Sequence, residues 1–274
     1  MRDIEKSADL LNVRNNSMSE STVKIATWNV NSLRVRLPQV LAWLETTQPD
    51  ILALQELKLP TEAFPHAAFA ALGYQAQVVG QKQYNGVAFV SKQPLVPLPR
   101  PEELAAHPEA RWLEVQWHGL RLLNLYAVNG AALDSPQYAY KLTWYAQVAA
   151  YLRRRQDERS PWIVLGDFNI APDDRDIYDP AALAGQLLCS LPERSALQAL
   201  GLSDLFRHCH PELQAFSWWD YRSAAFRRNQ GLRIDLILGN TLAQAACRDC
   251  HIDRAPRGWE RPSDHAPVSA EFIF

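Results

Sequence analysis

The sequence predicts a single α/β domain, a four-layer sandwich of two packed mixed β-sheets flanked by helices, and two observations support this fold class. From residue 23 onward, apolar segments rich in β-branched and aromatic residues alternate with amphipathic segments. Two of the apolar segments, 112–117 and 121–126, are separated only by His118-Gly119-Leu120, a spacing that predicts an antiparallel hairpin. Hairpins mixed with strand–helix units favour mixed sheets with helices on their outer faces.

Each predicted element follows from its local pattern, since continuous apolar runs predict strands and amphipathic runs predict helices. The predicted strands are residues 23–29, 50–55, 86–91, 112–117, 121–126, 161–166, 233–238 and 268–274. The predicted helices are residues 37–47, 61–72, 135–155 and 193–200.

The composition is that of an ordinary globular domain, with 47% hydrophobic and 21% charged residues, and no stretch approaches the roughly 20 apolar residues of a membrane span. Residues 1–22 are polar and lack an apolar signal core, so they predict a disordered extension of a domain at 23–274. We expect a cytoplasmic monomer with no membrane partner, translated from Met1 or from Met18.

Four cysteines, Cys189, Cys209, Cys247 and Cys250, are too few and too irregularly spaced for a disulfide framework. Cys247 and Cys250 have the CxxC spacing of a zinc or redox site but lack a second such pair, so free thiols are expected. The net charge of −2 does not single out a nucleic-acid binder, although a basic cleft can coexist with an acidic exterior.

Polar residues recur in or beside the ends of the predicted strands. Asp167 and Asn169 follow the apolar run 162–165 and, being two residues apart, leave the core on the same side of the chain. A simple Asx turn would also explain this pair. The same pattern recurs at Asn29, Asn31, Glu56, Tyr126, Asp235, Asp264 and His265. If the two sheets align, these side chains meet at one end of the sandwich, where ligand sites tend to lie.

This set of side chains offers carboxylates and amide oxygens but no thiolates, which suits a hard divalent cation such as Mg²⁺ or Mn²⁺. A metal beside Asp167 and His265 would suit attack by water on a phosphate, with Asn169 stabilising the charge that develops. A lone histidine before a strand is more often structural, but pairing with Asp235 would orient the imidazole of His265 as in hydrolases.

Five motifs occur in a fixed order: Trp28-Asn29-Val30-Asn31, Leu54-Gln55-Glu56, Gly166-Asp167-Phe168-Asn169, Gly231-Leu232-Arg233-Ile234-Asp235 and Ser263-Asp264-His265. As a set they resemble the exonuclease III family of apurinic/apyrimidinic (AP) endonucleases, which belongs to the endonuclease/exonuclease/phosphatase superfamily and has a DNase I-like fold. The resemblance runs from Val23 to Phe274. Two features depart from the family pattern, Leu57 in place of the usual threonine and the loop after Tyr126, and they leave the balance of nuclease activities open.

The resemblance implies a metal site with Glu56 as the principal ligand of Mg²⁺, for which Mn²⁺ can substitute. The implied ligands around this ion are Asn29, Glu56, Asp167, Asn169, Asp264 and His265, with Asn31 assisting.

The resemblance also implies catalytic roles. Asp167 would orient or deprotonate the attacking water, or protonate the leaving group, and Asn169 would hold the transition-state oxyanion. His265, oriented by Asp235, would contact the scissile phosphate, and Tyr126 would act beside it.

For the substrate, the resemblance implies that Trp218, Leu232 and Ile234 line a pocket for a flipped-out abasic sugar. Core packing remains the alternative for the other aromatic residues of the segment 216–221. The remaining implied DNA contacts are Asn31, Arg111, Asn129, Lys141 and Arg222.

The implied activity is Mg²⁺-dependent hydrolysis of the phosphodiester 5′ to abasic sites in double-stranded DNA, as in base excision repair. Further expected activities are 3′–5′ exonuclease, 3′-phosphatase and 3′-phosphodiesterase. One alternative is a catalytically inactive nucleic-acid-binding regulator, like the catabolite-repression control proteins, which would not need the full set of catalytic residues. Another is a phosphatase or phosphodiesterase acting on a small molecule or lipid, against which Tyr126 and Trp218 argue.

Overall fold

The computed structural model describes residues 22–155 and 159–274. The predicted disordered extension therefore lies outside the described residues, except for Thr22, which is the first residue of β1 (Thr22–Asn29). Within the described ranges, no helix is long and apolar enough to cross a membrane.

Two six-stranded sheets form the centre of the described part of the chain. The first holds β1, β2 (Ile51–Gln55), β3 (Gln75–Val79), β4 (Val87–Ser91), β11 (Cys247–Ile252) and β12 (Val268–Ile273), in the order β11-β12-β1-β2-β4-β3. The second holds β5 (Val96–Pro97), β6 (Trp112–Trp117), β7 (Leu120–Tyr126), β8 (Trp162–Asp167), β9 (Ser203–Asp204) and β10 (Asp235–Gly239), in the order β5-β6-β7-β8-β10-β9. Each sheet is mixed, because β1 and β2 pair in parallel, as do β7 and β8, whereas their other pairs are antiparallel.

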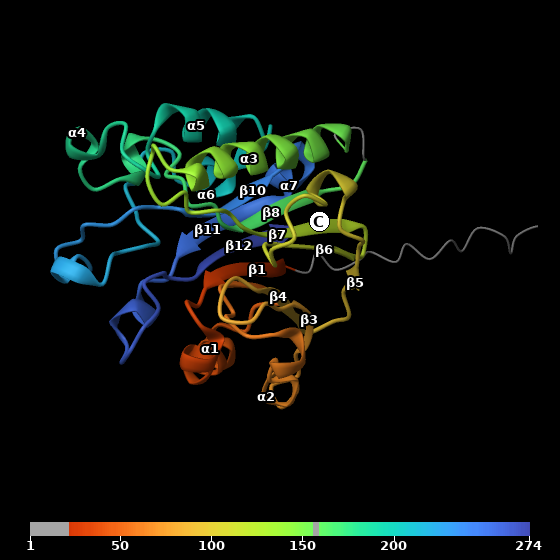
Figure 1. Cartoon of the computed structure of the whole chain (residues 1–274). Helices are drawn as coiled ribbons and strands as arrows, with labels where there is room; N and C mark the ends of the chain where they lie inside the picture. Colours follow the sequence, from red (N-terminus) through yellow and green to blue (C-terminus); the bar gives the residue numbers. More distant parts are fainter. Residues whose placement is uncertain (1–21, 156–158) are drawn as a thin grey trace, which may run out of the picture.

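Helices cover the outer faces of both sheets. They are α1 (Leu33–Thr47), α2 (His66–Ala70), α3 (Pro136–Arg154) and α5 (Leu191–Gln198). The short helices α4 (Pro180–Leu183), α6 (Leu205–Cys209) and α7 (Thr241–Ala246) lie elsewhere, and α6 and α7 contribute apolar side chains to the cluster between the two sheets. Figure 1 shows α3 and α5 above the second sheet and α1 and α2 below the first, with the two sheets between them. The predicted four-layer α/β sandwich is confirmed.

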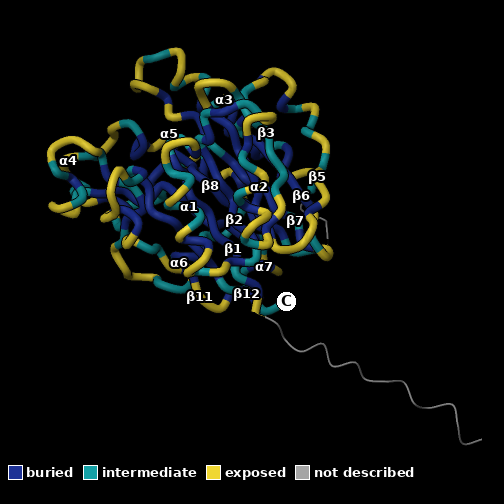
Figure 2. The backbone as a smooth tube through the Cα atoms, turned by 90° about the horizontal axis from the view of Figure 1, so that it is seen from below, coloured by how far each residue is buried: buried dark blue, intermediate teal, exposed yellow. Residues whose placement is uncertain are grey.

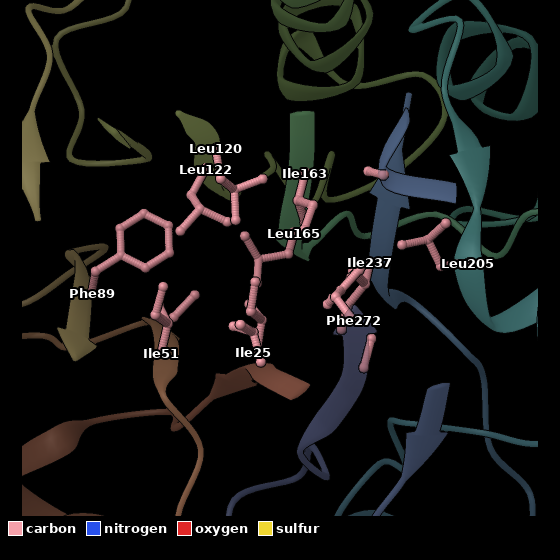
Figure 3. Close-up of a cluster of buried hydrophobic side chains, with 14 of the residues drawn as sticks. Ile25, Ile51, Phe89, Leu120, Leu122, Ile163, Leu165, Leu205, Ile237 and Phe272 are labelled. Carbon is pink, nitrogen blue, oxygen red and sulfur yellow. The ribbon is translucent and has the colours of Figure 1, made fainter. Parts of the chain in front are cut away.

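Three apolar clusters hold these layers together. In the central one, Ile25 and Ile51 of the first sheet face Ile163 and Leu165 of the second (Figure 3). A second cluster lies between the second sheet and α3, and a third lies between the first sheet and α1. The buried residues therefore follow the strands, while exposed residues lie in the outer helices and loops (Figure 2). Removing this apolar area from water is the main term that stabilises such a sandwich.

All eight predicted strands are present, each within two residues of its predicted bounds, and so is the predicted hairpin. Its turn is the two-residue pair His118-Gly119, with φ values of 43° and 82° that match the twist of the strands. The predicted single helix at 61–72 is wrong. It divides into a 3₁₀ turn, Thr61–Ala63, and α2, because Phe64 precedes Pro65 and is extended.

The four strands that the sequence did not predict, β3, β5, β9 and β11, are the edge strands of the two sheets. Edge strands are half-exposed, so β3 and β11 contain polar residues that break the apolar pattern. The other two are only two residues long.

The directions of the strands bring the predicted polar residues to one end of the sandwich. The strands β1, β2, β7 and β8 end there, whereas β10 and β12, which run antiparallel to β8 and β1, begin there. In the register, Tyr126 and Asp235 both lie beside Asp167. The expected convergence of strand ends is therefore present.

Candidate active site

Asn29 joins the ends of the two sheets. Its side-chain nitrogen Nδ2 donates to Glu56 Oε1 (3.0 Å) and to Asp167 Oδ2 (2.8 Å), and its Oδ1 accepts from the backbone N–H of Asn31 (2.9 Å). Asn29 is fully buried, so its amide has one arrangement. It fixes the spacing between two carboxylates that lie far apart in the sequence.

The backbone around Asp167 aims its carboxylate. Gly166 has a φ of +142°, and a Cβ there would lie 1.9 Å from the carbonyl oxygen of Leu125 on β7, so the close approach of the strands requires glycine. Asp167 Oδ1 accepts from the backbone N–H of Asn169 (2.9 Å), whose own φ is +49°. The Asx turn that the sequence analysis offered as an alternative is thus present. It orients the Asp167 carboxylate, so the turn and a functional role are compatible.

Glu56, Asp167 and His265 each bring one potential ligand atom within 4.8 Å of the others. The ammonium group of Lys58 lies against this cluster, 2.9 Å from Glu56 Oε2 and 2.5 Å from Asn31 Oδ1. A positive charge held by a carboxylate and an amide oxygen shows that the donor set attracts cations. Hard oxygen donors of this kind fit a divalent metal ion.

The other three predicted metal ligands surround this cluster and are bonded to its neighbours. Asn29 donates to two of the carboxylates, as described above. Asp264 accepts from Asn31 Nδ2 (3.0 Å) and from Trp218 Nε1 (3.0 Å). The Nδ2 group of Asn169 donates to the carbonyl oxygen of Ala127 (3.0 Å) and, at 3.3 Å, to Asp167.

His265 and Asp235 form a buried pair. His265 Nδ1 lies 2.9 Å from Asp235 Oδ2 and 3.1 Å from Oδ1, which leaves Nε2 directed toward Asp167 Oδ2 at 3.8 Å. Ser217 Oγ donates to Asp235 Oδ2 (2.6 Å) and accepts from the backbone N–H of Asp235 (3.0 Å). The imidazole therefore has a fixed orientation, with one nitrogen on a carboxylate and the other facing the acid cluster.

Burial and mutual charge shift the pKa values of these groups. Burial raises the pKa of Asp167 to about 7, against the opposing charge of His265. Burial alone would lower the pKa of His265, but the charges of Asp235 and the other nearby carboxylates raise it to about 10. Burial also opposes ionisation of Glu56, yet the charge of Lys58 holds the pKa of this carboxyl below its ordinary value. Without a bound metal ion, the site therefore favours a protonated imidazole at His265 and an ionised Glu56, while burial opposes ionisation of Asp167.

Tyr126 ends β7 beside this cluster, and Arg111 covers its ring. Burial, with the charges of Glu56 and Asp167, raises the pKa of Tyr126 well above its ordinary value, so its hydroxyl stays protonated and can donate a hydrogen bond. The Arg111 guanidinium lies 4.6 Å from the ring centroid and donates to the carbonyl oxygens of Tyr126 and Ala127. Arg111 thus supports the tyrosine as a cation–π partner.

The three residues predicted to line a sugar pocket lie together. Trp218, Leu232 and Ile234 belong to one apolar cluster, whose other members are Ala171, Ile177, Leu183, Leu187, Leu188 and Cys189. The backbone of Trp218 bridges to both Leu232 and His265, so this cluster adjoins the imidazole. Trp219 belongs instead to a separate buried cluster, so the role of this tryptophan is core packing, the alternative considered from the sequence.

The remaining predicted DNA contacts differ in their surroundings. Asn129 is exposed and donates to Asn169 Oδ1 (3.0 Å). Arg222 is also exposed, and its guanidinium pairs with Asp220 (2.7 Å). Lys141 is fully buried and paired with Glu193, and this burial does not fit its interpretation as a phosphate contact.

Three residues contribute to the site without having been assigned a role from the sequence. Lys58 stands two residues after Glu56, just beyond the motif Leu54-Gln55-Glu56. Ser217 opens the aromatic segment that holds Trp218, but no sequence pattern reveals its bond to Asp235. Glu193 completes a Ser-x-x-Glu capping box at the start of α5, a signal that predicts a helix start and not a partner for Lys141.

The cysteines do not form a second site in the part of the chain that the structure describes. They are free, and the closest contact is 3.8 Å between Cys209 Sγ and Cys247 Sγ. Among the described residues, the acid cluster with His265 is the only group of three potential metal-ligating side chains. The zinc alternative therefore finds no support there.

Comparisons with known proteins agree with this geometry. The model of the endonuclease/exonuclease/phosphatase family matches residues 26–265. Exodeoxyribonuclease III of Haemophilus influenzae is 37% identical over 266 residues, which cover 91% of this chain and all of that protein. Two solved structures cover 92% of this chain and all of theirs: a Neisseria 3′ phosphatase, NExo, bound to a product DNA hairpin (46% identity, TM-score 0.89), and an AP endonuclease from Archaeoglobus fulgidus (35% identity, TM-score 0.88). The chain therefore belongs to the endonuclease/exonuclease/phosphatase family and is a DNA repair nuclease of the exonuclease III type.

Proposed function

We propose that this nuclease uses Mg²⁺ to hydrolyse the phosphodiester on the 5′ side of abasic sites in double-stranded DNA, acting as a cytoplasmic monomer. The observation that carries the proposal is the contact between the acid cluster and the apolar cluster of Trp218, Leu232 and Ile234, made where Trp218 pairs with His265. A phosphate held at the cluster would place its neighbouring sugar against the pocket.

The chain's own residues supply binding, orientation and proton transfer. Glu56 and Asp167 would hold the cation, which neutralises charge on the phosphate when bound. The Asn29 and Asn169 amides turn their N–H groups toward these carboxylates, so they would position the ligands and would not bind the ion themselves. Burial raises the pKa of the metal-free Asp167 carboxyl toward neutrality, which favours a role in accepting a proton from water or returning one to the leaving oxygen. The raised pKa of His265 favours its protonated form, so it would donate from Nε2 to a phosphate oxygen. This role does not fit the metal ligation by His265 that the resemblance implies, because a protonated nitrogen cannot bind a cation.

Asn169 would stabilise the transition state through its amide. Its Nδ2 group already donates to the Ala127 carbonyl at 3.0 Å and to Asp167 at the longer distance of 3.3 Å. The second bond is the weaker one, so it is the one that Asn169 would exchange for a phosphate oxygen.

The apolar cluster of Trp218, Leu232 and Ile234 is the surface that we propose receives a nucleotide lacking a base. Leu232 and Ile234 are almost entirely buried, and Trp218 closes the cluster toward the site. Flipping a nucleotide out of the duplex costs least where the base is missing, and an apolar pocket can accept a sugar without reading sequence.

A second candidate activity is the processing of blocked or recessed 3′ ends, including 3′-phosphatase, 3′-phosphodiesterase and 3′–5′ exonuclease activity. It is favoured by the higher identity to the Neisseria 3′ phosphatase, 46%, than to the archaeal AP endonuclease, 35%. A terminal 3′ phosphate needs the same acid cluster but no flipped sugar, so the two activities make different demands on the pocket.

The test is a side-by-side assay of matched duplexes that carry an internal abasic site, a 3′ phosphate or an undamaged recessed 3′ end. Fastest turnover of the abasic duplex supports our proposal. Fastest turnover at the 3′ phosphate, with slow abasic incision, would replace it with the second candidate. DNA binding without cleavage of any duplex would favour a non-catalytic regulator, and release of phosphate only from inositol phosphates or lipids would favour a small-molecule enzyme.

A further inference from the structure

Lys141 lies in the second turn of α3, and its ammonium group is buried behind two asparagines of the site. Its Nζ donates to the backbone carbonyl oxygens of Asn129 (3.1 Å) and Asn169 (2.7 Å) and to Glu193 Oε1 (2.5 Å). An ammonium group has three N–H donors, and these three bonds use all of them. Lys141 therefore fixes the backbone of Asn169, whose amide donates to Asp167, and of Asn129, whose amide donates to Asn169.

Glu193, the partner of Lys141, accepts hydrogen bonds from the turn at residues 188–190. Its Oε1 also accepts from the backbone N–H of Leu188 (3.1 Å), and its Oε2 accepts from the backbone N–H (3.1 Å) and the hydroxyl (2.7 Å) of Ser190. Leu188 has a φ of +70°, an uncommon conformation for a side chain of this size that needs fixed partners. Leu188 is also a member of the apolar pocket cluster.

One ion pair thus connects two parts of the site. On one side are Asn129 and Asn169, which are themselves joined by a hydrogen bond between their side chains (3.0 Å). On the other side is the turn at 188–190, which forms part of the pocket. The α3 and α5 helices that carry the pair lie side by side on the outer face of the second sheet (Figure 1).

Stability alone does not account for this pair. Burying two charges costs desolvation energy, and an apolar pair of similar volume is often as stabilising or more so. An apolar pair could not, however, donate to the carbonyl oxygens of Asn129 and Asn169. The feature that requires a lysine here is the position of the two asparagines.

We propose that Lys141 and Glu193 are positioning residues for phosphodiester hydrolysis: the pair sets the orientation of the Asn129 and Asn169 amides at the phosphate and ties them to the pocket wall. This inference rests on the proposed hydrolytic function. It replaces direct phosphate contact by Lys141 with an indirect role.

The experiment compares Lys141→Met and Glu193→Gln with Glu114→Gln, in the Mg²⁺-loaded enzyme and on whichever duplex the wild type cleaves fastest. Glu114 is a matched control, because it is equally buried and paired with Arg121 (2.9 Å) but does not bond to a site residue. We expect kcat to fall by about 10- to 100-fold for the two test variants, the scale of a small misplacement, while KM changes by less than about threefold. The control should lose thermal stability but keep its kcat.

One result would overturn the inference. If folded Lys141→Met and Glu193→Gln keep a kcat within about twofold of the Glu114→Gln control, the pair is structural only. If Lys141→Met does not fold, the same comparison of kcat with the Glu114→Gln control is made for the nearly isosteric Glu193→Gln alone. Failure of the wild type to cleave any duplex would instead remove the proposed function itself, and this outcome is distinguishable because it does not depend on the variants.

Discussion

At the centre of the site, polar side chains bond to partners from distant strands, whereas Arg222, an exposed predicted DNA contact at the rim of the site, bonds to a residue close by in the chain. Asn29 reaches Asp167, 138 residues away, and Asp235 reaches His265, 30 residues away. Arg222, in contrast, pairs with Asp220, two residues before it. The sheets hold the centre in one arrangement, while the rim residues can exchange local partners for a ligand. Substitutions should therefore affect chemistry at the centre and binding at the rim.

Removing the metal should have the largest effect on the centre. With EDTA in excess, we expect DNA cleavage to fall by about 1,000-fold or more, since the phosphate charge then lacks its main counter-charge. Steady-state rates before chelation, after chelation and after adding back Mg²⁺ or Mn²⁺ measure this effect. Undiminished cleavage in EDTA would mean that the acid cluster does not act through a cation.

Changing the imidazole should have the next largest effect. We expect His265→Ala to lower kcat by about 100- to 1,000-fold, the scale of removing one donor to transition-state charge. Asp235→Asn should lower it less, because it alters the orientation and charge of the imidazole but leaves the ring in place. Equal kcat values for His265→Ala and the wild type would remove the histidine from the chemistry.

The centre should also give the metal-free protein a characteristic pH dependence of stability. Asp167 has a folded pKa raised to about 7, so folding favours its protonated form, and its contribution is lost as pH rises from about 4 to 7. The pKa of His265 is raised to about 10, so its contribution to stability is also lost with rising pH, over the higher range from about 6.5 to 10. Urea unfolding in EDTA should therefore show wild type losing stability relative to Asp167→Asn between pH 4 and 7. A difference that stays constant with pH would contradict this account.

The smallest effect is expected at the rim. Arg222 is exposed and bound only to its neighbour Asp220, so Arg222→Ala should raise KM by about threefold or less and leave kcat unchanged. It should also make the salt dependence of DNA binding slightly less steep, because one phosphate contact is lost. Measuring KM at two salt concentrations tests this, and a fall in kcat comparable to that of His265→Ala would erase the distinction between centre and rim.

The sequence predicts the centre better than the rim for a physical reason. An apolar run fixes where a strand ends, so the amino-acid pattern places Glu56, Asp167 and His265 at strand ends, and alignment of the two sheets then brings these ends together. The partner of a long loop or helix side chain depends on local packing. Lys141 illustrates this, since its pattern fits both an exposed phosphate contact and the buried partner of Glu193.

The edge strands and the break in the predicted helix at 61–72 were missed for a related reason. Edge strands carry polar residues on exposed faces, and a single proline, Pro65, ends a helical pattern that is otherwise continuous. Ser217 left no signal at all, because a serine that bonds to a buried carboxylate looks like any other serine in the sequence.

The most direct test of the central role of the strand-end cluster is the single-turnover rate of duplex cleavage by Asp167→Asn in Mg²⁺, compared with the wild type on the same DNA. This substitution keeps the size and hydrogen-bonding shape of the side chain but removes the group that exchanges a proton. We predict a rate at least about 1,000-fold lower, with DNA affinity in metal-free buffer retained. A rate within about tenfold of the wild type would contradict the assignment of the chemistry to this cluster.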